Sequence, residues 1–562
     1  MTSRFWRYYH TLRYLRPGQL FWRIWFRVYV PVPDRNSAPT LRKRRGRWQP
    51  VVARQPTMTG ANAFVFLNRA GNLHGPADWN ASEPEKLWIY NLHYFDDLNA
   101  AEAAQRREWH RDLLQRWVRE NPPAHGNGWE PYPTSLRIVN WIKWALAGNA
   151  LEPGVAASLA VQARWLAVRL ERHLLGNHLL ANAKALVFAG MYFEGKEADR
   201  WLSKGLALLD RELGEQILSD GGHFERSPMY HAIILEDLLD LINLAGSAQN
   251  GLTQHRVPGW RRTAARMLEW LRLMCHPDGK IAFFNDAAFG IAPEYDALYA
   301  YAQRLGVNPE LSENIAAVRL PGGGRLTDLA SSGYVRVELS GSVAILDLAK
   351  VGPDYLPGHA HADTLSFELS YTNQRIIVNS GCSTYALGPE RLRQRGTPAH
   401  NTVAIDGRDS SEVWGAFRVA RRARPFGRDT RVTEDGAEIC CAHDGYRRLP
   451  GKPVHRRLWR FGPRGVTIRD EIDGLSANAV AHYHFHPSVA INLKGKAAVV
   501  QQRDAVIARV DVKQGSPELV ESSYHPEFGV DIPSRCLQVG LQNQTSEIHI
   551  LWALDAHPVS DR

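Results

Sequence analysis

The sequence predicts an α+β chain in which a ring of helical hairpins is followed by an antiparallel β-sandwich. Two observations predict this class. Between about residues 86 and 300, apolar residues recur at helical spacing in successive segments of similar length. After Gly322-Gly323-Gly324 the pattern changes to short alternating or β-branched runs separated by turns. Because 562 residues exceed a single hydrophobic core, we divide the chain into residues 1–60, 61–325 and 326–562.

The first 60 residues form a basic, aromatic segment that ends in a proline-rich linker. Residues 1–56 hold twelve arginines and one lysine against a single acidic residue, Asp34, so the net charge of +10 belongs to this segment. It contains no apolar stretch long enough for a signal-peptide core or a membrane span. We favour helices that pack their aromatic side chains on the body and expose their arginines. A membrane-surface helix or an arm for an acidic partner stays open, whereas the nearly neutral body argues against nucleic-acid binding.

The helical region consists of amphipathic segments broken by turns. The expected helices span residues 107–120, 135–147, 155–174, 177–192, 199–218, 230–244 and 260–275. Successive helices of similar length predict antiparallel hairpins stacked around a ring. The loops at one end of such a ring would line a cleft.

The second half shows almost no helical periodicity. The expected strands include residues 333–339, 342–348, 375–378, 401–405, 466–472, 481–485, 506–510 and 548–551, and they predict antiparallel sheets packed as a sandwich. Five scattered cysteines without a CxxC pair argue against a disulfide framework or a thiolate zinc site. Since Walker A and GxGxxG motifs are also missing, we expect no organic cofactor.

Three stretches concentrate polar and aromatic residues where helices should begin. Each places a turn before an apolar helical run, and the backbone donors of a helix N-terminus suit an anion. The alternative, equally supported, is a set of helix caps and buried hydrogen-bond networks. The candidate binding residues in these stretches are Trp129, Glu130, Tyr132, Arg137, Asn140, Asn177, His178, Glu225, Arg226 and Tyr230.

A series of histidines marks the β half. His359 and His361 precede the alternating run 364–369, which predicts a strand with both imidazoles on the same side of its start. His361, Asn379 and His400 each adjoin an expected strand, so they could converge on one metal, and imidazole favours zinc. Asn379 is the weak member because a neutral amide binds zinc poorly. A metal-free hydrogen-bonded cluster is an equal alternative.

Four of these motifs, in this order and spacing, resemble those of the heparinase II/III-like family of polysaccharide lyases. They are Gly176-Asn-His178, Arg226-Ser-Pro-Met-Tyr230-His, His359-Ala-His361-Ala-Asp and Ala399-His400-Asn-Thr402. The opening segment also resembles that of the bacterial, exopolysaccharide-associated branch of the family. The resemblance implies an incomplete α/α toroid followed by an antiparallel β-sandwich. It also implies a periplasmic or cell-envelope location, although the missing export signal leaves a cytoplasmic one open.

The resemblance further implies β-elimination at a uronic acid of an acidic polysaccharide. Asn177 and His178 match the family pair that neutralises the uronate carboxylate. Tyr230 matches the tyrosine that serves as acid, and for some stereochemistries as base. His359 matches the histidine that serves as base or as partner of that tyrosine. Because a phenol needs a lowered pKa to act as base near neutrality, we expect Arg226 or an imidazole beside Tyr230.

The remaining family positions are matched less fully. His361 and His400 match two metal positions, but Asn379 stands where aspartate is usual, so one structural zinc is an uncertain expectation. Tyr385 is the only tyrosine between Asn379 and His400, and its spacing is early. Arg393 lies in the same loop, where arginines suit an anionic chain.

Two other functions stay open. A glycoside hydrolase on the same toroid would need two carboxylates, which Glu130 with Glu225 or Asp286 could supply. A non-catalytic polysaccharide-binding or exopolysaccharide-biosynthesis accessory protein would need neither acid nor base.

Overall fold

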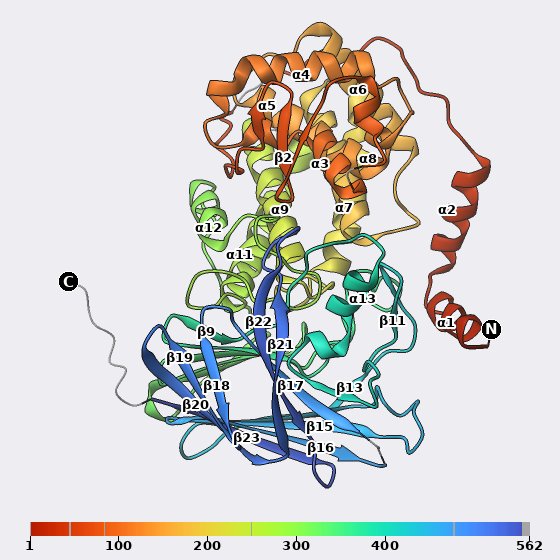
Figure 1. The fold of residues 1–562 in the computed structure, drawn as a ribbon. Helices are drawn as coiled ribbons and strands as arrows, with labels where there is room; N and C mark the ends of the chain where they lie inside the picture. The colour runs from red at the N-terminus through yellow and green to blue at the C-terminus, as the bar shows by residue number, and fades with distance from the viewer. Residues whose placement is uncertain (1, 44–45, 84, 249, 476–477, 554–562) are drawn as a thin grey trace.

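The chain folds into a helical domain stacked on a β domain, with the N-terminal helices along one flank (Figure 1). The computed structural model describes residues 2–43, 46–83, 85–248, 250–475 and 478–553. Arg44 and Arg45 of the basic segment, and residues 554–562 of the expected β domain, lie outside the described residues. Among the described helices, none is long and apolar enough to cross a membrane.

The helical domain is built from antiparallel hairpins, as the periodicity predicted. Its helices are α3 (Lys86–Tyr94), α4 (Arg107–Glu120), α5 (Pro131–Leu146), α6 (Pro153–Val168), α7 (Gly176–Tyr192), α8 (Lys196–Gln216), α9 (Pro228–Ala248), α10 (Gly251–Gln254), α11 (Val257–Leu273) and α12 (Tyr295–Arg304). The central helix α7 is apolar nearly all round because it packs between α5, α8 and α9. Large side chains such as Trp117 and Trp141 fill the core. The periodicity was therefore read correctly, with helix ends displaced by a few residues.

A small sheet precedes these helices and was not predicted. It consists of β1 (Met58–Gly60), β2 (Ala63–Phe66) and β3 (Arg69–Asn72) in the order β1-β2-β3. Phe64 and Phe66 of β2 join the core of the helical domain. Strands of three or four residues are too short to show a period. Of the three, only β1 falls within the predicted linker, which ended at residue 60.

The β domain contains two large antiparallel sheets. The first has the order β21-β22-β17-β9-β8-β7-β6-β5-β4, with β10 beside β17, and the second has the order β13-β14-β15-β16-β23-β20-β19-β18. Apolar residues of both sheets, such as Val337 and Phe367 of the first and Trp459 and Ile548 of the second, form one core. This confirms the predicted sandwich.

The strands of the first sheet are β4 (Ala316–Arg319), β5 (Arg325–Leu329), β6 (Tyr334–Leu339), β7 (Ser342–Asp347), β8 (Phe367–Tyr371), β9 (Gln374–Ile377), β10 (Val403–Ile405), β17 (Ala479–Phe485), β21 (Ser516–Tyr524) and β22 (Ile532–Gly540). Those of the second are β13 (Pro425–Val432), β14 (Ala437–His443), β15 (Val454–Gly462), β16 (Gly465–Asp473), β18 (Ala490–Lys494), β19 (Ala497–Gln502), β20 (Ala505–Gln514) and β23 (Thr545–Trp552). A short hairpin, β11 (Val413–Trp414) with β12 (Arg418–Val419), and helix α13 (Pro389–Arg395) are inserted between them. Because β4 begins before residue 326, the all-β region starts earlier than the predicted boundary.

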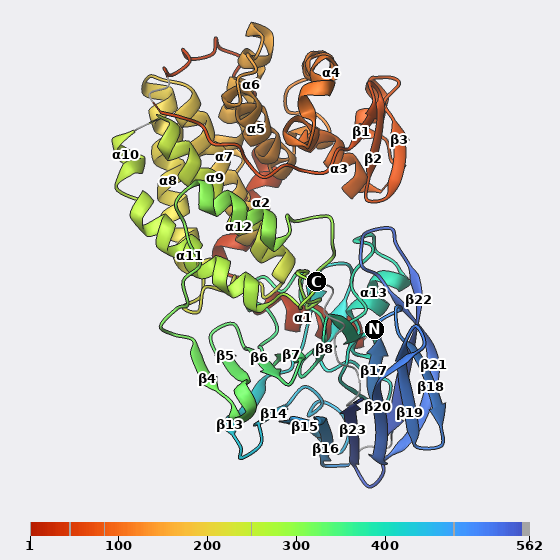
Figure 2. The same ribbon diagram turned by 90° about the vertical axis from the view of Figure 1, so that its left-hand side faces the viewer.

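The N-terminal helices α1 (Thr2–Leu12) and α2 (Pro17–Val28) lie against both domains. Figure 1 shows them along the right-hand flank, and in Figure 2 they lie behind other elements of the two domains. The favoured packing of their aromatic side chains on the body is wrong for one face of each helix, because Phe5, Trp6 and Tyr9 of α1 are exposed as well. Phe21, Ile24 and Trp25 are 55%, 66% and 41% exposed.

Candidate active site

The two domains meet at a cluster of acid–base side chains. Tyr230, in the first turn of α9, stacks on His359 with ring centroids 4.0 Å apart. Its hydroxyl lies 3.0 Å from that of Tyr385, which follows β9. His359 comes from the loop between β7 and β8, so the helical domain supplies one member and the β domain the other two. The predicted proximity of Tyr230 and His359 is therefore present in the structure. Tyr385 also belongs to the cluster, although its position in the sequence is earlier than the family spacing.

Asp286 holds these side chains in place. The sequence indicated it only as a possible carboxylate of the hydrolase alternative. This fully buried residue in the loop before α12 accepts hydrogen bonds from His359 Nδ1 at 2.9 Å and His361 Nε2 at 2.8 Å. Arg391 of α13 donates two further bonds to the same carboxylate. The backbone N–H of Asp286 also donates to the carbonyl of His359. One carboxylate therefore holds both histidines of the 359–361 motif across the domain junction.

The start of α9 is tied to the same residue. Ser227 Oγ donates to the Asp286 carbonyl at 2.6 Å and accepts the backbone N–H of Tyr230 at 3.2 Å. This is the N-cap role expected of a serine before a helix. The cap sets the position of the Tyr230 side chain relative to His359.

The hydrogen bonds also fix which nitrogen of His359 carries the proton. Burial opposes ionisation of Asp286, but Arg391 and the two histidines outweigh it and hold its pKa well below the usual range. A carboxylate only accepts, so Nδ1 of His359 donates. In the neutral ring Nε2 therefore carries the lone pair, because the hydrogen bond made by one ring nitrogen decides the protonation of the other. His359 is thus arranged as a base.

Tyr230 is arranged as an acid. Burial, followed by the negative charge of Asp286, raises its pKa well above the ordinary value of 10.0. The expected imidazole is beside the phenol, but it does not produce the lowered pKa that a tyrosine base would need, and Arg226 is engaged elsewhere. The hydroxyl is therefore protonated near neutral pH, and the Tyr385 hydroxyl can donate to it once it has lost its proton.

Asn177 and His178 open α7 close to this cluster. Asn177 Nδ2 donates to Glu225 Oε1 at 2.9 Å, and Glu225 Oε2, which has no hydrogen-bond partner among the described residues, lies 3.9 Å from His359 Nε2. His178 Nδ1 lies 3.1 Å from Glu171 Oε1. Burial lowers the pKa of His178, but Glu171 outweighs it and the net pKa is raised. An amide and an imidazole whose protonated form is favoured by Glu171 thus lie at the start of one helix.

Gly176, which begins α7, lies at a close approach between the domains. Its φ of +58° favours glycine, and a Cβ there would meet Leu356 of the β domain at 2.2 Å and Glu225 at 3.0 Å. The glycine lets α7 begin directly against the loop that carries His359.

His361, Asn379 and His400 are brought together as a hydrogen-bonded chain. His361 Nδ1 lies 3.2 Å from His400 Nε2, and His400 Nδ1 lies 3.2 Å from Asn379 Oδ1. That amide oxygen also accepts from Ser366 Oγ at 2.7 Å. Within the described residues, no group of three His, Cys, Asp or Glu side chains is placed to hold a metal. The donor set is one anionic ligand short of a usual zinc site, so it does not fit the expected zinc well, and no chemical step is assigned to a metal.

Several predicted binding residues belong to the interior. Trp129 packs against Trp117 in the core and donates its indole N–H to a backbone carbonyl. Arg137 is fully buried over the same Trp117 ring, and Asn140 donates to Asp96 Oδ1 at 2.7 Å. For these three, the alternative of buried packing and hydrogen-bond networks describes the structure. The sequence located the start of α5 but not which of its faces points inward.

The other predicted binding residues are dispersed around the junction. Tyr132 stacks on His178 at 4.5 Å, and Glu130 binds Lys86 Nζ at 2.9 Å. Arg226 Nε donates to the carbonyl of Ser332, while Arg393 lies on α13 and pairs with Glu390 and His525. Of these residues, Tyr132 is the one placed beside the Asn177–His178 pair.

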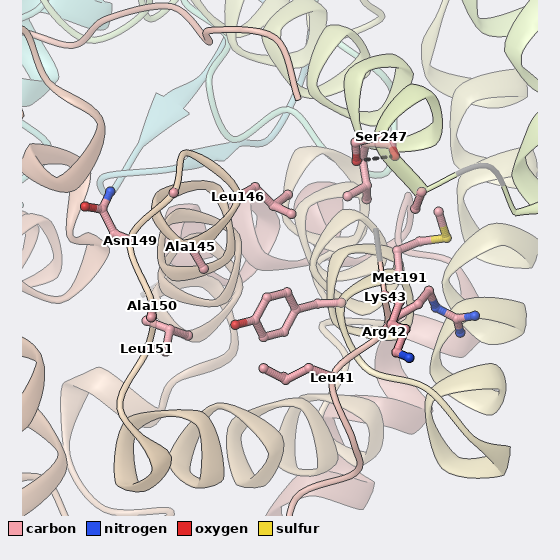
Figure 3. Close-up of a pocket in the computed structure, with 14 residues that line it drawn as sticks. Leu41, Arg42, Lys43, Ala145, Leu146, Asn149, Ala150, Leu151, Met191 and Ser247 are labelled. Carbon is pink, nitrogen blue, oxygen red and sulfur yellow. Dashed lines mark hydrogen bonds between the residues drawn. The ribbon is translucent and has the colours of Figure 1, made fainter. Parts of the chain in front are cut away.

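A cavity of about 270 Å³ lies away from this cluster, in the helical domain. Leu41, Arg42 and Lys43 of the N-terminal linker cover it, and the ends of α5, α7 and α9 form its walls (Figure 3). Within α9, Ser247 Oγ donates to the Leu244 carbonyl. None of the candidate catalytic residues lines this cavity.

Comparison with known proteins places the chain in a family. It matches "Heparinase II/III N-terminus" over residues 89–307 and "Heparinase II/III-like, C-terminal" over residues 321–552. Together the two matches cover more than half of the chain. The chain belongs to the heparinase II/III-like family.

Individual relatives are distant. A heparin-sulfate lyase of Bacteroides stercoris is 26% identical over 249 residues, which cover 42% of this chain and 37% of that protein. A heparin-sulfate lyase of Pedobacter heparinus is 27% identical, covering 53% and 48%. The chain thus spans less than half the length of these two lyases. FtsZ-localized protein C of Caulobacter vibrioides is 26% identical over 462 residues, covering 75% of this chain and 74% of that protein.

Solved structures confirm the fold. Heparinase III superposes with a TM-score of 0.63 at 18% identity, covering 84% of this chain and 79% of that structure. Heparan sulfate lyase HepC from Pedobacter heparinus superposes with a TM-score of 0.57 at 17% identity, covering 96% and 88%. The predicted order of toroid and sandwich is confirmed.

Proposed function

We propose that the protein is a polysaccharide lyase that cleaves a uronate-containing acidic polysaccharide by β-elimination. The observation that carries the proposal is the pairing of Tyr230 and His359, stacked at 4.0 Å, with the His359 ring oriented by buried Asp286. One member is a phenol held protonated, and the other is an imidazole that donates through Nδ1 and so carries its lone pair on Nε2. An acid and a base side by side are what elimination across two adjacent sugar carbons needs.

In the proposed reaction, His359 Nε2 removes the proton from C5 of the uronate. The electrons of the C5–H bond form the C4=C5 double bond as the C4–O bond breaks. Tyr230 protonates the departing glycosidic oxygen. His359 has then gained the proton from C5, and Tyr230 has lost its phenolic proton. Tyr385 donates to the resulting phenolate, and the proton on His359 returns to Tyr230, directly or through solvent, before the next turnover.

The uronate carboxylate has to be neutralised before C5 becomes acidic enough. Asn177 and His178 are the groups that would do this, because an amide donor and an imidazolium together favour the charge that develops on the carboxylate. The raised pKa of His178 supports this role. Tyr132, stacked on that imidazole, would place a sugar ring beside the pair.

The hydrolase alternative is less well supported. Hydrolysis needs one carboxylic acid and one carboxylate free to act. Asp286 is locked by Arg391 and two histidines, and Glu130 is paired with Lys86 and Tyr90. Glu225 alone keeps an oxygen without a partner among the described residues.

A second candidate is a non-catalytic role. The relative with the widest two-way coverage among those compared is named for its localisation with FtsZ, not for a lyase activity. We infer that an accessory or positioning protein built on this fold stands as the alternative to be tested.

A panel of acidic polysaccharides, including exopolysaccharide of the source organism, tests both. The lyase proposal expects new ultraviolet absorbance from the unsaturated product. Absorbance should fall to background for Tyr230→Phe at unchanged folding. If polysaccharides of the panel bind but none is cleaved, and Tyr230→Phe leaves binding unaltered, the non-catalytic role replaces the lyase.

A further inference from the structure

The N-terminal strap, which we define as α1 and α2, presents an unusually apolar outer face. On α2 the exposed apolar side chains are Leu20, Phe21, Ile24, Trp25 and Val28, at 43%, 55%, 66%, 41% and 79% exposure. On α1, Phe5, Trp6, Tyr9 and Leu12 are 67%, 49%, 49% and 47% exposed. Contiguous apolar surface of this kind is rare on a soluble protein unless something binds it.

The exposed residues of α2 share one side of the helix. Positions 20, 21, 24, 25 and 28 follow the spacing of a single helical face. The opposite face holds the body: Gln19 Nε2 donates to the carbonyl of Tyr355, and Phe26 lies 5.8 Å from the ring of His173. The apolar side therefore faces outward because the inward side is already occupied.

Charge distinguishes the kind of partner. Arg4 and Arg7 lie on α1 and Arg23 and Arg27 on α2, while Arg13 and Arg16 lie between the two helices. The first acidic residue of the chain is Asp34. Arg23 and Arg27, one turn apart, border the apolar face of α2 along one edge. Arg418 of the adjoining β12 stacks over Tyr8 and Trp414. An apolar helical face with arginines along its edge matches a partner whose interior is apolar and whose surface carries negative charge.

The strap is fixed to both domains while its outer face stays free. Arg16 stacks on Tyr355 at 3.6 Å and pairs with Glu215 of α8. Trp414 Nε1 donates to Thr11 Oγ1 at 3.1 Å, which ties α1 to the β11–β12 hairpin. Figure 1 shows the strap on the right-hand flank of the molecule. Binding through the outer face would not require the strap to leave the body.

From these observations we propose that the strap is an interfacial anchor that binds the surface of an anionic lipid bilayer. Aromatic and branched aliphatic side chains on one face with arginines beside them are the composition of helices that lie in the headgroup region. Arginines near an anionic leaflet add about fivefold in affinity each. A single convex helical face with no complementary acidic groove fits a bilayer better than a protein partner. This inference does not depend on the proposed lyase activity.

Flotation of the full chain with vesicles tests the proposal. The expected result is binding to vesicles of phosphatidylcholine with 30% phosphatidylglycerol, weakened about tenfold or more on pure phosphatidylcholine or in high salt. Phe21→Gln/Ile24→Gln/Trp25→Gln, which keeps good helix formers, should lose binding at least about tenfold. Arg23→Glu/Arg27→Glu should lose about 25-fold or more on the anionic vesicles.

The matched control replaces three exposed apolar residues on other surfaces, Leu252→Gln/Leu475→Gln/Val506→Gln, at 46%, 77% and 43% exposure. It should float as the wild type does. Circular dichroism and the unfolding midpoint check that both triple variants are folded. The proposal is overturned if the wild type does not float with anionic vesicles, or if the strap variant floats as well as the control. It is also overturned if the strap binds an acidic protein or heparin resin but no vesicle.

Discussion

Replacing Asp286 by asparagine tests whether one buried carboxylate organises the proposed acid–base site around His359. Asp286 is fully buried and receives hydrogen bonds from His359, His361 and Arg391. An asparagine there has half the accepting capacity and turns a donor toward one of these donors. Arg391, itself fully buried, is then left with an unpaired charge.

Breaking a buried ion pair from one side costs about 3–5 kcal/mol, because the remaining charge is still desolvated. We expect a loss of this size for Asp286→Asn in urea unfolding followed by tryptophan fluorescence. Arg391→Met should lose a similar amount. In the double variant neither charge remains, so the two losses should fall short of additivity by about 2–3 kcal/mol.

The pH dependence of the same stabilisation has a definite sign. The folded-state pKa of Asp286 is held well below its ordinary value. The stabilisation is therefore fully present above the ordinary carboxyl range and is lost as the pH falls through the depressed folded value. Asp286→Asn should flatten this acid limb of the stability profile.

Asp278 provides a matched control. It pairs with Arg375 at 2.7 Å but is 31% exposed, and Arg375 keeps Glu368 at 3.6 Å as a second partner. Asp278→Asn should cost no more than about 1 kcal/mol. Additive losses for Asp286 and Arg391, or a loss at Asp286 no larger than at Asp278, would refute the reasoning.

Three further predictions concern the chemistry and the metal. Tyr230→Phe should lower kcat about 10²–10⁴-fold on the substrate that the polysaccharide panel identifies. Tyr385→Phe, measured in the same assay, should lower kcat less. Equal losses for the two variants would contradict a supporting role for Tyr385. Because Glu171 raises the pKa of His178 above the ordinary 6.5, KM for a uronate polymer should rise as the pH increases through that raised value. His178→Gln should remove this pH dependence. A pH-independent KM in the wild type would argue against a role of His178 in binding the uronate carboxylate. Asn379→Asp supplies the missing anionic ligand, so the variant should purify with more zinc than the wild type by elemental analysis, and equal contents would show that Asn379 does not limit binding.

The fold could be predicted from the sequence where a regular hydrophobic pattern extends over a whole helix or strand. The helix 107–120 was predicted with the bounds of α4, and the expected strand 342–348 is β7 but for its last residue. The histidine motif is different, since the alternation from 364 predicted a strand whereas β8 begins at Phe367. Leu365 there has a φ of +64°, which no regular strand contains. Both histidines nevertheless reach the same side, because Asp286 binds both.

The site could be predicted only in part, and the reason is tertiary. Tyr230, His359 and Asn177 belong to recognisable motifs, but Asp286 lies 73 residues from His359 in a loop with no period of its own. Its role exists only once the domains are docked. Conversely, Trp129 and Arg137 have the composition of a sugar-binding stretch, but both are buried in the core, Trp129 just before α5 and Arg137 within it. Tyr385 looked misplaced in sequence because α13 is inserted between it and His400.

The exposed face of α2 illustrates the same limit. The sequence favoured helices with their aromatic side chains against the body, but α2 has aromatic side chains on both sides and only some of them meet the body. The contacts of Gln19, Trp22 and Phe26 decide this, since they take up the inner side and leave Phe21 and Ile24 outside.

The central claim is that Tyr230 and His359 form an acid–base pair for elimination. The most direct test is the ultraviolet absorbance of a purified uronate polysaccharide during incubation with the wild type, Tyr230→Phe and His359→Ala, with reducing ends measured in parallel. The account predicts that absorbance and reducing ends rise together for the wild type and that both stay at background for the two variants. Reducing ends released without new absorbance, or undiminished absorbance with either variant, would contradict it.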